Sequence, residues 1–100
     1  MNTFAILYEY ITDADQVASH RPQHRAFLSE LQDNGQLIGS GPFTDENGGA
    51  LIIIRLPEPA GITDAEQLMD ADPFNRHGII TGRQIRSWNP VKNVFRAPGE

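Results

Sequence analysis

The sequence predicts a single α+β domain in which strand-like and helix-like segments alternate. Residues 3–10 and 50–56 are rich in β-branched and aromatic side chains, and both segments are apolar on their two faces. In residues 22–33 and 64–71, apolar residues recur at spacings of three, four and seven, which is the period of an amphipathic helix. A chain of 100 residues is long enough to bury one two-layer core. We therefore treat residues 1–100 as one domain.

Four strands are expected, at residues 3–10, 36–43, 50–56 and 79–88. In the first strand, Phe4 and Tyr8 fall on one face and Leu7 on the other. Gly41-Pro42 makes the end of the second strand irregular, which suits an edge or a place where a ligand approaches the backbone. The turn residues 45–49, DENGG, predict a hairpin between the second and third strands.

The first helix is expected at about residues 22–33. Arg21 would be its N-cap and Pro22 its first residue, because proline lacks only an N–H that has no partner there. Asn34-Gly35 would end it, since glycine adopts the left-handed conformation that follows many helices.

The second helix is expected at about residues 64–71, after the capping box Thr63-x-x-Glu66. Asp72 falls on the apolar stripe of this helix, and Pro73 follows it directly. Residues 73–78 should form a short turn. The core of the domain would then be residues 3–89, and residues 90–100 a C-terminal tail.

The resulting order, β-α-β-β-α-β, predicts the ferredoxin-like sandwich, an antiparallel four-stranded sheet with both helices on one face. The other face of the sheet would be bare. Because the first and third strands are apolar on both faces, a second copy of the chain is expected to cover it, in a symmetric homodimer.

Composition narrows the class of function. The net charge of −5 argues against a nucleic-acid partner, which needs a basic surface. The chain has no cysteine, so disulfides and thiolate metal sites are excluded. We see no membrane span and no targeting leader at Met1. These features predict a cytoplasmic protein with a small-molecule ligand or substrate.

His24 and Asp72 are the candidate catalytic residues. His24 shares a helical face with Phe27, Leu28 and Leu31, so its imidazole should point toward the sheet. In the first turn of a helix, the dipole would keep that ring neutral. A carboxylate on one ring nitrogen fixes the tautomer and makes the other nitrogen a better base. The open alternative is a structural histidine and an Asx turn at Asp72.

Other constellations have less support. His20 and His24 are four residues apart, but Pro22 suggests that the helix begins after His20, and His77 is distant in sequence. We therefore expect no metal site and no cofactor. No serine lies in a nucleophile-elbow motif.

Several of these residues together resemble the YciI-like (YCII) family. The resemblance covers about residues 3–90, and no single motif carries it alone. It rests on the aromatic first strand, Arg21-Pro22-x-His24, Gly41-Pro42, Ala71-Asp72-Pro73-Phe74 and Ile85-Arg86-x-Trp88-Asn89. One departure is Ser87, where a proline is common before the tryptophan.

The resemblance implies a dimeric α/β-barrel built from two ferredoxin-like subunits. It implies a cleft with a histidine and an aspartate, matched by His24 and Asp72. One relative is a dehydrochlorinase acting on a chlorinated ring-cleavage lactone or muconate, and the wider superfamily includes muconolactone isomerases. The residues expected to contact substrate are Tyr8, Arg21, Gly41, Pro42 and Phe74.

The leading interpretation is thus a small lyase, isomerase or dehydrochlorinase-like enzyme that uses the His–Asp pair for proton transfer on a small organic acid or lactone. The alternative is a non-catalytic ligand-binding or accessory domain with a structural His–Asp contact. A heme- or metal-dependent relative on the same barrel has little residue support.

Overall fold

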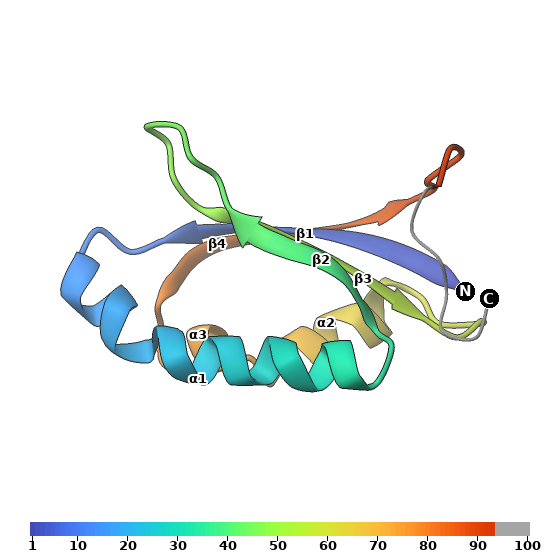
Figure 1. The fold of residues 1–100 in the computed structure, drawn as a ribbon, viewed down its shortest axis with the longest axis horizontal. Helices are drawn as coiled ribbons and strands as arrows, with labels where there is room; N and C mark the ends of the chain where they lie inside the picture. Colours follow the sequence, from blue (N-terminus) through green and yellow to red (C-terminus); the bar gives the residue numbers. More distant parts are fainter. Residues whose placement is uncertain (94–100) are drawn as a thin grey trace.

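A computed structural model describes residues 1–93 of the chain as a four-stranded antiparallel sheet with all its helices on one face (Figure 1). The strand order is β2-β3-β1-β4, so the ferredoxin-like prediction is confirmed. In chain order the elements are β1 (Asn2–Tyr10), α1 (Ala14–Asp33), β2 (Leu37–Pro42), β3 (Ala50–Leu56), α2 (Ile62–Asp70), α3 (Pro73–Arg76) and β4 (Ile80–Trp88).

The core lies between the sheet and the helices. Residues opposite one another in an antiparallel pair point to the same face, and Phe4 pairs with Ile54 and Ile6 with Ile52. All four of these side chains are buried, as are Met69 and Phe74 from the helical layer. The register of β1 against β4 shifts between Glu9 and Tyr10, an irregularity of the kind that a β-bulge produces.

The start of α1 corrects the prediction. The helix begins at Ala14, and the Asp13 carboxylate caps it by accepting from the backbone N–H groups of Asp15 and Gln16. Pro22 therefore lies inside a 20-residue helix, and the N-terminal turns of α1 stand at an angle to the rest (Figure 1). Arg21 is not an N-cap, and His24 is not in the first turn. The dipole argument for a neutral ring consequently does not apply.

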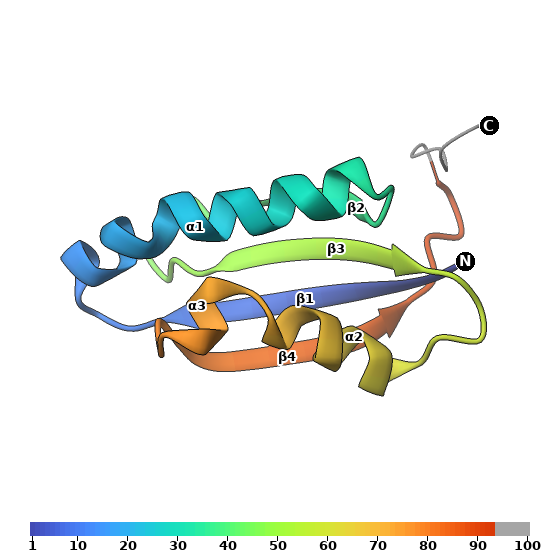
Figure 2. The same ribbon diagram turned by 90° about the horizontal axis from the view of Figure 1, so that it is seen from below.

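The second helical region also differs from the prediction. At the start of α2 the Asp64 carboxylate accepts from the N–H of the N-cap residue Gly61 at 2.8 Å. The predicted capping box of Thr63 and Glu66 is therefore wrong, and Gly61 has no side chain with which to complete another. The expected turn after Asp72 contains the one-turn helix α3. Asp72 is the N-cap of α3, where its carboxylate accepts from the Phe74 N–H at 3.0 Å. In Figure 2, α3 lies between α2 and the first half of α1.

The opposite face of the sheet carries no helix among the described residues (Figure 1). Its central side chains are partly buried and apolar, namely Ala5, Leu7, Leu51 and Ile53. Phe43 and Trp88 are exposed. None of the described helices is long and apolar enough to cross a membrane. Of the predicted tail, residues 94–100 lie outside the described part of the chain.

Candidate active site between α1 and α3

The structure brings His24 and Asp72 into direct contact, 48 residues apart in sequence. The imidazole Nδ1 lies 2.9 Å from both Asp72 carboxylate oxygens. Asp72 has no exposed surface and His24 is 7% exposed, so the contact is shielded from water. Because a carboxylate only accepts when ionised, Nδ1 carries the proton in this contact. The lone pair of a neutral ring is then on Nε2.

Asp72 accepts from two further donors, the Tyr8 hydroxyl and the Phe74 N–H. The Tyr8 hydroxyl donates to Oδ2 at 2.8 Å, and the Asn75 amide donates to the Tyr8 hydroxyl at 2.9 Å. The same amide group donates to the Met69 carbonyl. Burial raises the pKa of Tyr8 far above its ordinary value, and the charge of Asp72 raises it further. The phenol therefore remains a donor, and the position of the carboxylate is fixed from β1, α3 and the backbone together.

Aromatic rings fix the plane of the imidazole. The Phe74 ring stacks on His24 with a centroid distance of 4.1 Å and an interplanar angle of 5°. The Tyr10 ring meets Phe74 edge-on at 5.6 Å. Phe74 is fully buried. Tyr8 and Phe74, expected to contact substrate, thus lie behind the His–Asp pair and support it.

The other side of His24 faces a cavity of about 370 Å³ between α1 and the β2–β3 edge of the sheet. Three residues predicted to contact substrate, Arg21, Gly41 and Pro42, line this cavity together with His24. No described residue forms a hydrogen bond with His24 Nε2. The free nitrogen of an oriented imidazole next to a ligand-sized cavity is the arrangement required of a general base.

The lining also contains residues that sequence reasoning missed: Tyr10, Arg25, Leu28, Ser40, Ala50 and Ile52. The position of Arg25 follows from helical spacing, since Arg21, His24, Arg25 and Leu28 are at i, i+3, i+4 and i+7 on α1. Asn75 was missed as well, although it lies only three residues after Asp72. For Tyr10 and Ser40 no local signal exists, because only the fold places them opposite the helix.

The histidine arrangement differs from the prediction. His20 and His24 lie on the same helix, and the rings of His20 and His77 are 4.9 Å apart, although the sequence suggested separate positions. Within residues 1–93, however, no group of three or more histidine, aspartate or glutamate side chains could hold a metal ion.

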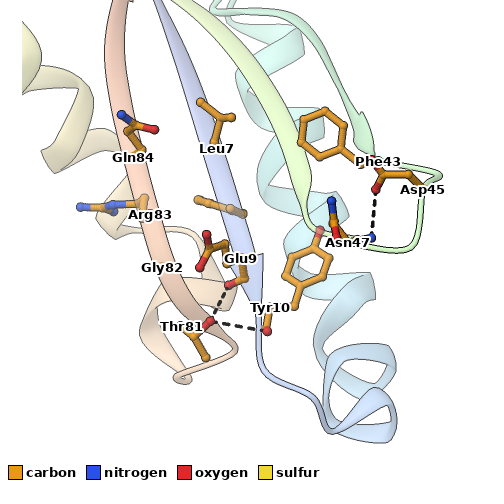
Figure 3. Close-up of a pocket in the computed structure, with 12 residues that line it drawn as sticks. Leu7, Glu9, Tyr10, Phe43, Asp45, Asn47, Thr81, Gly82, Arg83 and Gln84 are labelled. Atoms are coloured by element: carbon orange, nitrogen blue, oxygen red, sulfur yellow. Dashed lines mark hydrogen bonds between the residues drawn. The ribbon is translucent and has the colours of Figure 1, made fainter.

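A second and larger hollow, of about 880 Å³, lies where β1 and β4 meet the loop between β2 and β3. Figure 3 shows Leu7 and Glu9 on its floor, with Phe43, Asp45 and Asn47 of the loop at one side. Within the loop the Asn47 N–H donates to the Asp45 carboxylate at 3.1 Å, and across the strands the Thr81 hydroxyl donates to the Glu9 carbonyl at 3.3 Å. This open-face hollow contains no histidine.

Comparison with known proteins decides the family. The sequence matches the YCII-related domain over residues 2–89. The chain belongs to the YCII-related family. A comparison with curated proteins finds no match.

Solved structures of similar fold include three of different origin. The 5-chloro-2-hydroxyhydroquinone dehydrochlorinase (TftG) of Burkholderia phenoliruptrix AC1100, in complex with 2,5-dihydroxybenzoquinone, is 18% identical at a TM-score of 0.72, covering 87% of this chain and 93% of that one. The de novo designed protein Ferredog-Diesel is 13% identical at a TM-score of 0.54, and the match covers 89% of this chain and 85% of that one. An antibiotic biosynthesis monooxygenase is 9% identical at a TM-score of 0.55, and the match covers 89% of this chain and 97% of that one. At these identities the three structures show the fold alone.

Proposed function

We propose that this YCII-related protein is a small lyase, isomerase or dehydrochlorinase-like enzyme in which His24 is the general base. The observation that carries the proposal is the buried contact between His24 Nδ1 and both oxygens of Asp72, with Nε2 left free beside the cavity. Asp72 is then a positioning residue. It fixes the tautomer and stabilises the imidazolium that forms when Nε2 accepts a proton.

The proposed substrate is a small organic acid or lactone with a hydrogen on the carbon next to its carbonyl. Nε2 takes that proton, and the C–H electron pair forms the double bond of an enolate while the carbonyl electrons move to oxygen. An isomerase returns the proton to another carbon. In a dehydrochlorinase the enolate instead expels chloride from the neighbouring carbon, so that a carbon–carbon double bond forms and HCl is lost overall. The dehydrochlorinase activity named for the similar structure, TftG, supports this reaction class.

A specific observation favours the alternative of a non-catalytic ligand-binding domain. Asp72 also caps α3 and accepts from Tyr8, so the fold uses the carboxylate whether or not a reaction follows. The two hypotheses share the cavity. They differ in whether His24 exchanges protons with a ligand.

Proton exchange into D₂O separates them. The full chain is incubated with muconolactone and related acids and lactones, and NMR follows the loss of the signal from the hydrogen next to the carbonyl. We expect exchange above the buffer rate, reduced roughly 100-fold or more in His24→Gln. The matched control is Glu9→Gln in the open-face hollow, which should leave the rate unchanged. Equal rates in the wild type and His24→Gln would favour the binding domain.

We also propose that a second copy of the chain covers the helix-free face in a homodimer. The partly buried apolar side chains of β1 and β3 on that face support it. Sedimentation of the full chain tests the assembly. The cytoplasmic location and the lack of a nucleic-acid partner remain predictions from composition.

A further inference from the structure

Two arginines share the cavity with the proposed base. Arg21 and Arg25 are one helical turn apart on α1, and both line the cavity on the same helical face as His24. Like charges at this spacing repel each other. Such a pair weakens the helix unless an anion lies between the two guanidinium groups.

No described residue supplies that anion. The ion pairs in the described part of the chain join Met1 to Glu58, His24 to Asp72 and Arg83 to Asp70, and neither Arg21 nor Arg25 takes part. The cavity lining contains no carboxylate. Yet the chain has 13 acidic residues against 8 basic ones, so acids are not scarce.

The opposite wall adds hydrogen-bond donors rather than negative charge. Ser40 on β2 and Tyr10 on β1 line the cavity, and each carries a hydroxyl group. Burial raises the pKa of Tyr10, an effect that Arg21 partly opposes, and the phenol therefore remains neutral at neutral pH. Apart from the free nitrogen of His24, every polar side chain around this cavity can donate a hydrogen bond, and none of them carries a negative charge.

We infer that the cavity selects a ligand with a carboxylate, which Arg21 and Arg25 hold while the enolisable part of the ligand faces His24. Arginine suits this task because its planar group binds a carboxylate through paired hydrogen bonds. The inference deepens the proposed function and rests on it for the orientation toward His24. It names the substrate class as a small acid with a carbonyl group a few carbons from its carboxylate.

The probe is levulinate, a keto acid, and its matched control is methyl levulinate, which has the same carbon chain without the charge. Amide NMR shifts of the uniformly ¹⁵N-labelled full chain are followed during titration with each compound. We expect levulinate to shift amides in α1 and β2 around the cavity, and methyl levulinate to bind at least about tenfold more weakly. Equal binding of acid and ester, or no shifts around the cavity, would overturn the inference.

Variants locate the carboxylate. Arg21→Gln and Arg25→Gln keep hydrogen-bonding ability but shorten the side chain and lose the charge, and each should weaken levulinate binding about tenfold. Arg86→Gln is the control, because Arg86 is exposed on β4 and does not line the cavity. A loss in Arg86→Gln equal to that in the other two would mean general charge attraction and overturn the inference.

His24→Gln separates this inference from the proposed function. If levulinate binds through the arginines but its hydrogens exchange no faster than in buffer, the carboxylate site stands and the base role fails. If exchange depends on His24 but binding is indifferent to both arginines, the base role stands and the carboxylate site fails.

Discussion

The two hollows of this molecule differ in how many buried hydrogen bonds and ring contacts support the side chains that line them. The smaller one, beside His24, is backed by a buried chain of hydrogen bonds from Asn75 through Tyr8 to Asp72 and by a stacked phenylalanine. The larger one has the exposed Glu9 and the partly buried Leu7 on its floor, and the hydrogen bond inside its loop joins residues only two apart. Volume alone would therefore favour a different hollow from the one that the buried contacts indicate. Buried polar groups are costly to arrange, and here they converge on one imidazole.

The largest expected effect comes from removing the shared carboxylate. Asp72→Ala leaves the Tyr8 hydroxyl and His24 Nδ1 without their acceptor and removes the N-cap of α3. Breaking a buried polar pair and a cap together should lower the free energy of unfolding by about 3 kcal/mol. Urea denaturation measures this loss.

The open-face hollow provides the control. Asp45 is exposed and accepts from the Asn47 N–H of its own loop, so Asp45→Ala should cost no more than about 0.5–1 kcal/mol. Losses of similar size in the two variants would contradict the view that the fold is built around Asp72. Asp72→Asn, which keeps shape and an acceptor oxygen, should lie between them.

The sequence predicted the fold well because periodicity and turn residues are local. The strand at residues 50–56 has the predicted bounds, and the other three strands differ by at most one residue at either end. The predicted start of α1 was wrong, because it rested on the common occurrence of proline at the first helical position. In the structure Asp13 caps the helix and Pro22 lies inside it. Whether a helix bends at an internal proline depends on its packing against the rest of the fold. No local rule distinguishes such a helix from one that starts at the proline.

The site was predictable in part for the same reason. The His24–Asp72 contact was expected from topology, although Asp72 reaches His24 as the cap of α3 and not from the end of α2. Tyr8 was expected on the cleft wall, whereas its hydroxyl donates to Asp72 behind the imidazole. The face of β1 predicted for Tyr8 was nevertheless correct. Tyr10 and Ser40 come from strands that reach the cavity only after the sheet has formed. Their roles depend on long-range packing and have no sequence signal.

A second prediction addresses what covers the larger hollow. If the helix-free face is the homodimer interface, Leu7→Lys places a charge among apolar side chains at its centre. We expect the dimer dissociation constant to rise about 100-fold, which corresponds to about 2.7 kcal/mol. Sedimentation over a range of concentrations measures it. Ser29→Lys, exposed on α1, is the matched control. A wild type that sediments as a monomer throughout would remove the dimer proposal.

The smallest effect is expected from Tyr8→Phe, and its dependence on pH is the informative part. At neutral pH the variant should lose about 1 kcal/mol of unfolding free energy, because Asp72 keeps His24 and the Phe74 N–H as donors. The pKa of Tyr8 is raised in the folded protein, so the unfolded chain releases this proton first as pH rises. Wild-type stability should therefore fall above about pH 10, where unfolded tyrosine ionises.

Tyr8→Phe should reduce this alkaline loss, so that its stability approaches that of the wild type as pH rises. Tyr10→Phe is the control. Its hydroxyl has no hydrogen bond to a described residue, and its pKa is also raised by burial. It should cost less than Tyr8→Phe at neutral pH. An alkaline loss of equal steepness in the wild type and in Tyr8→Phe would mean that the phenol is not confined by Asp72. The network behind His24 would then be looser than the contacts indicate, because a donor that ionises freely cannot hold the carboxylate that orients the ring.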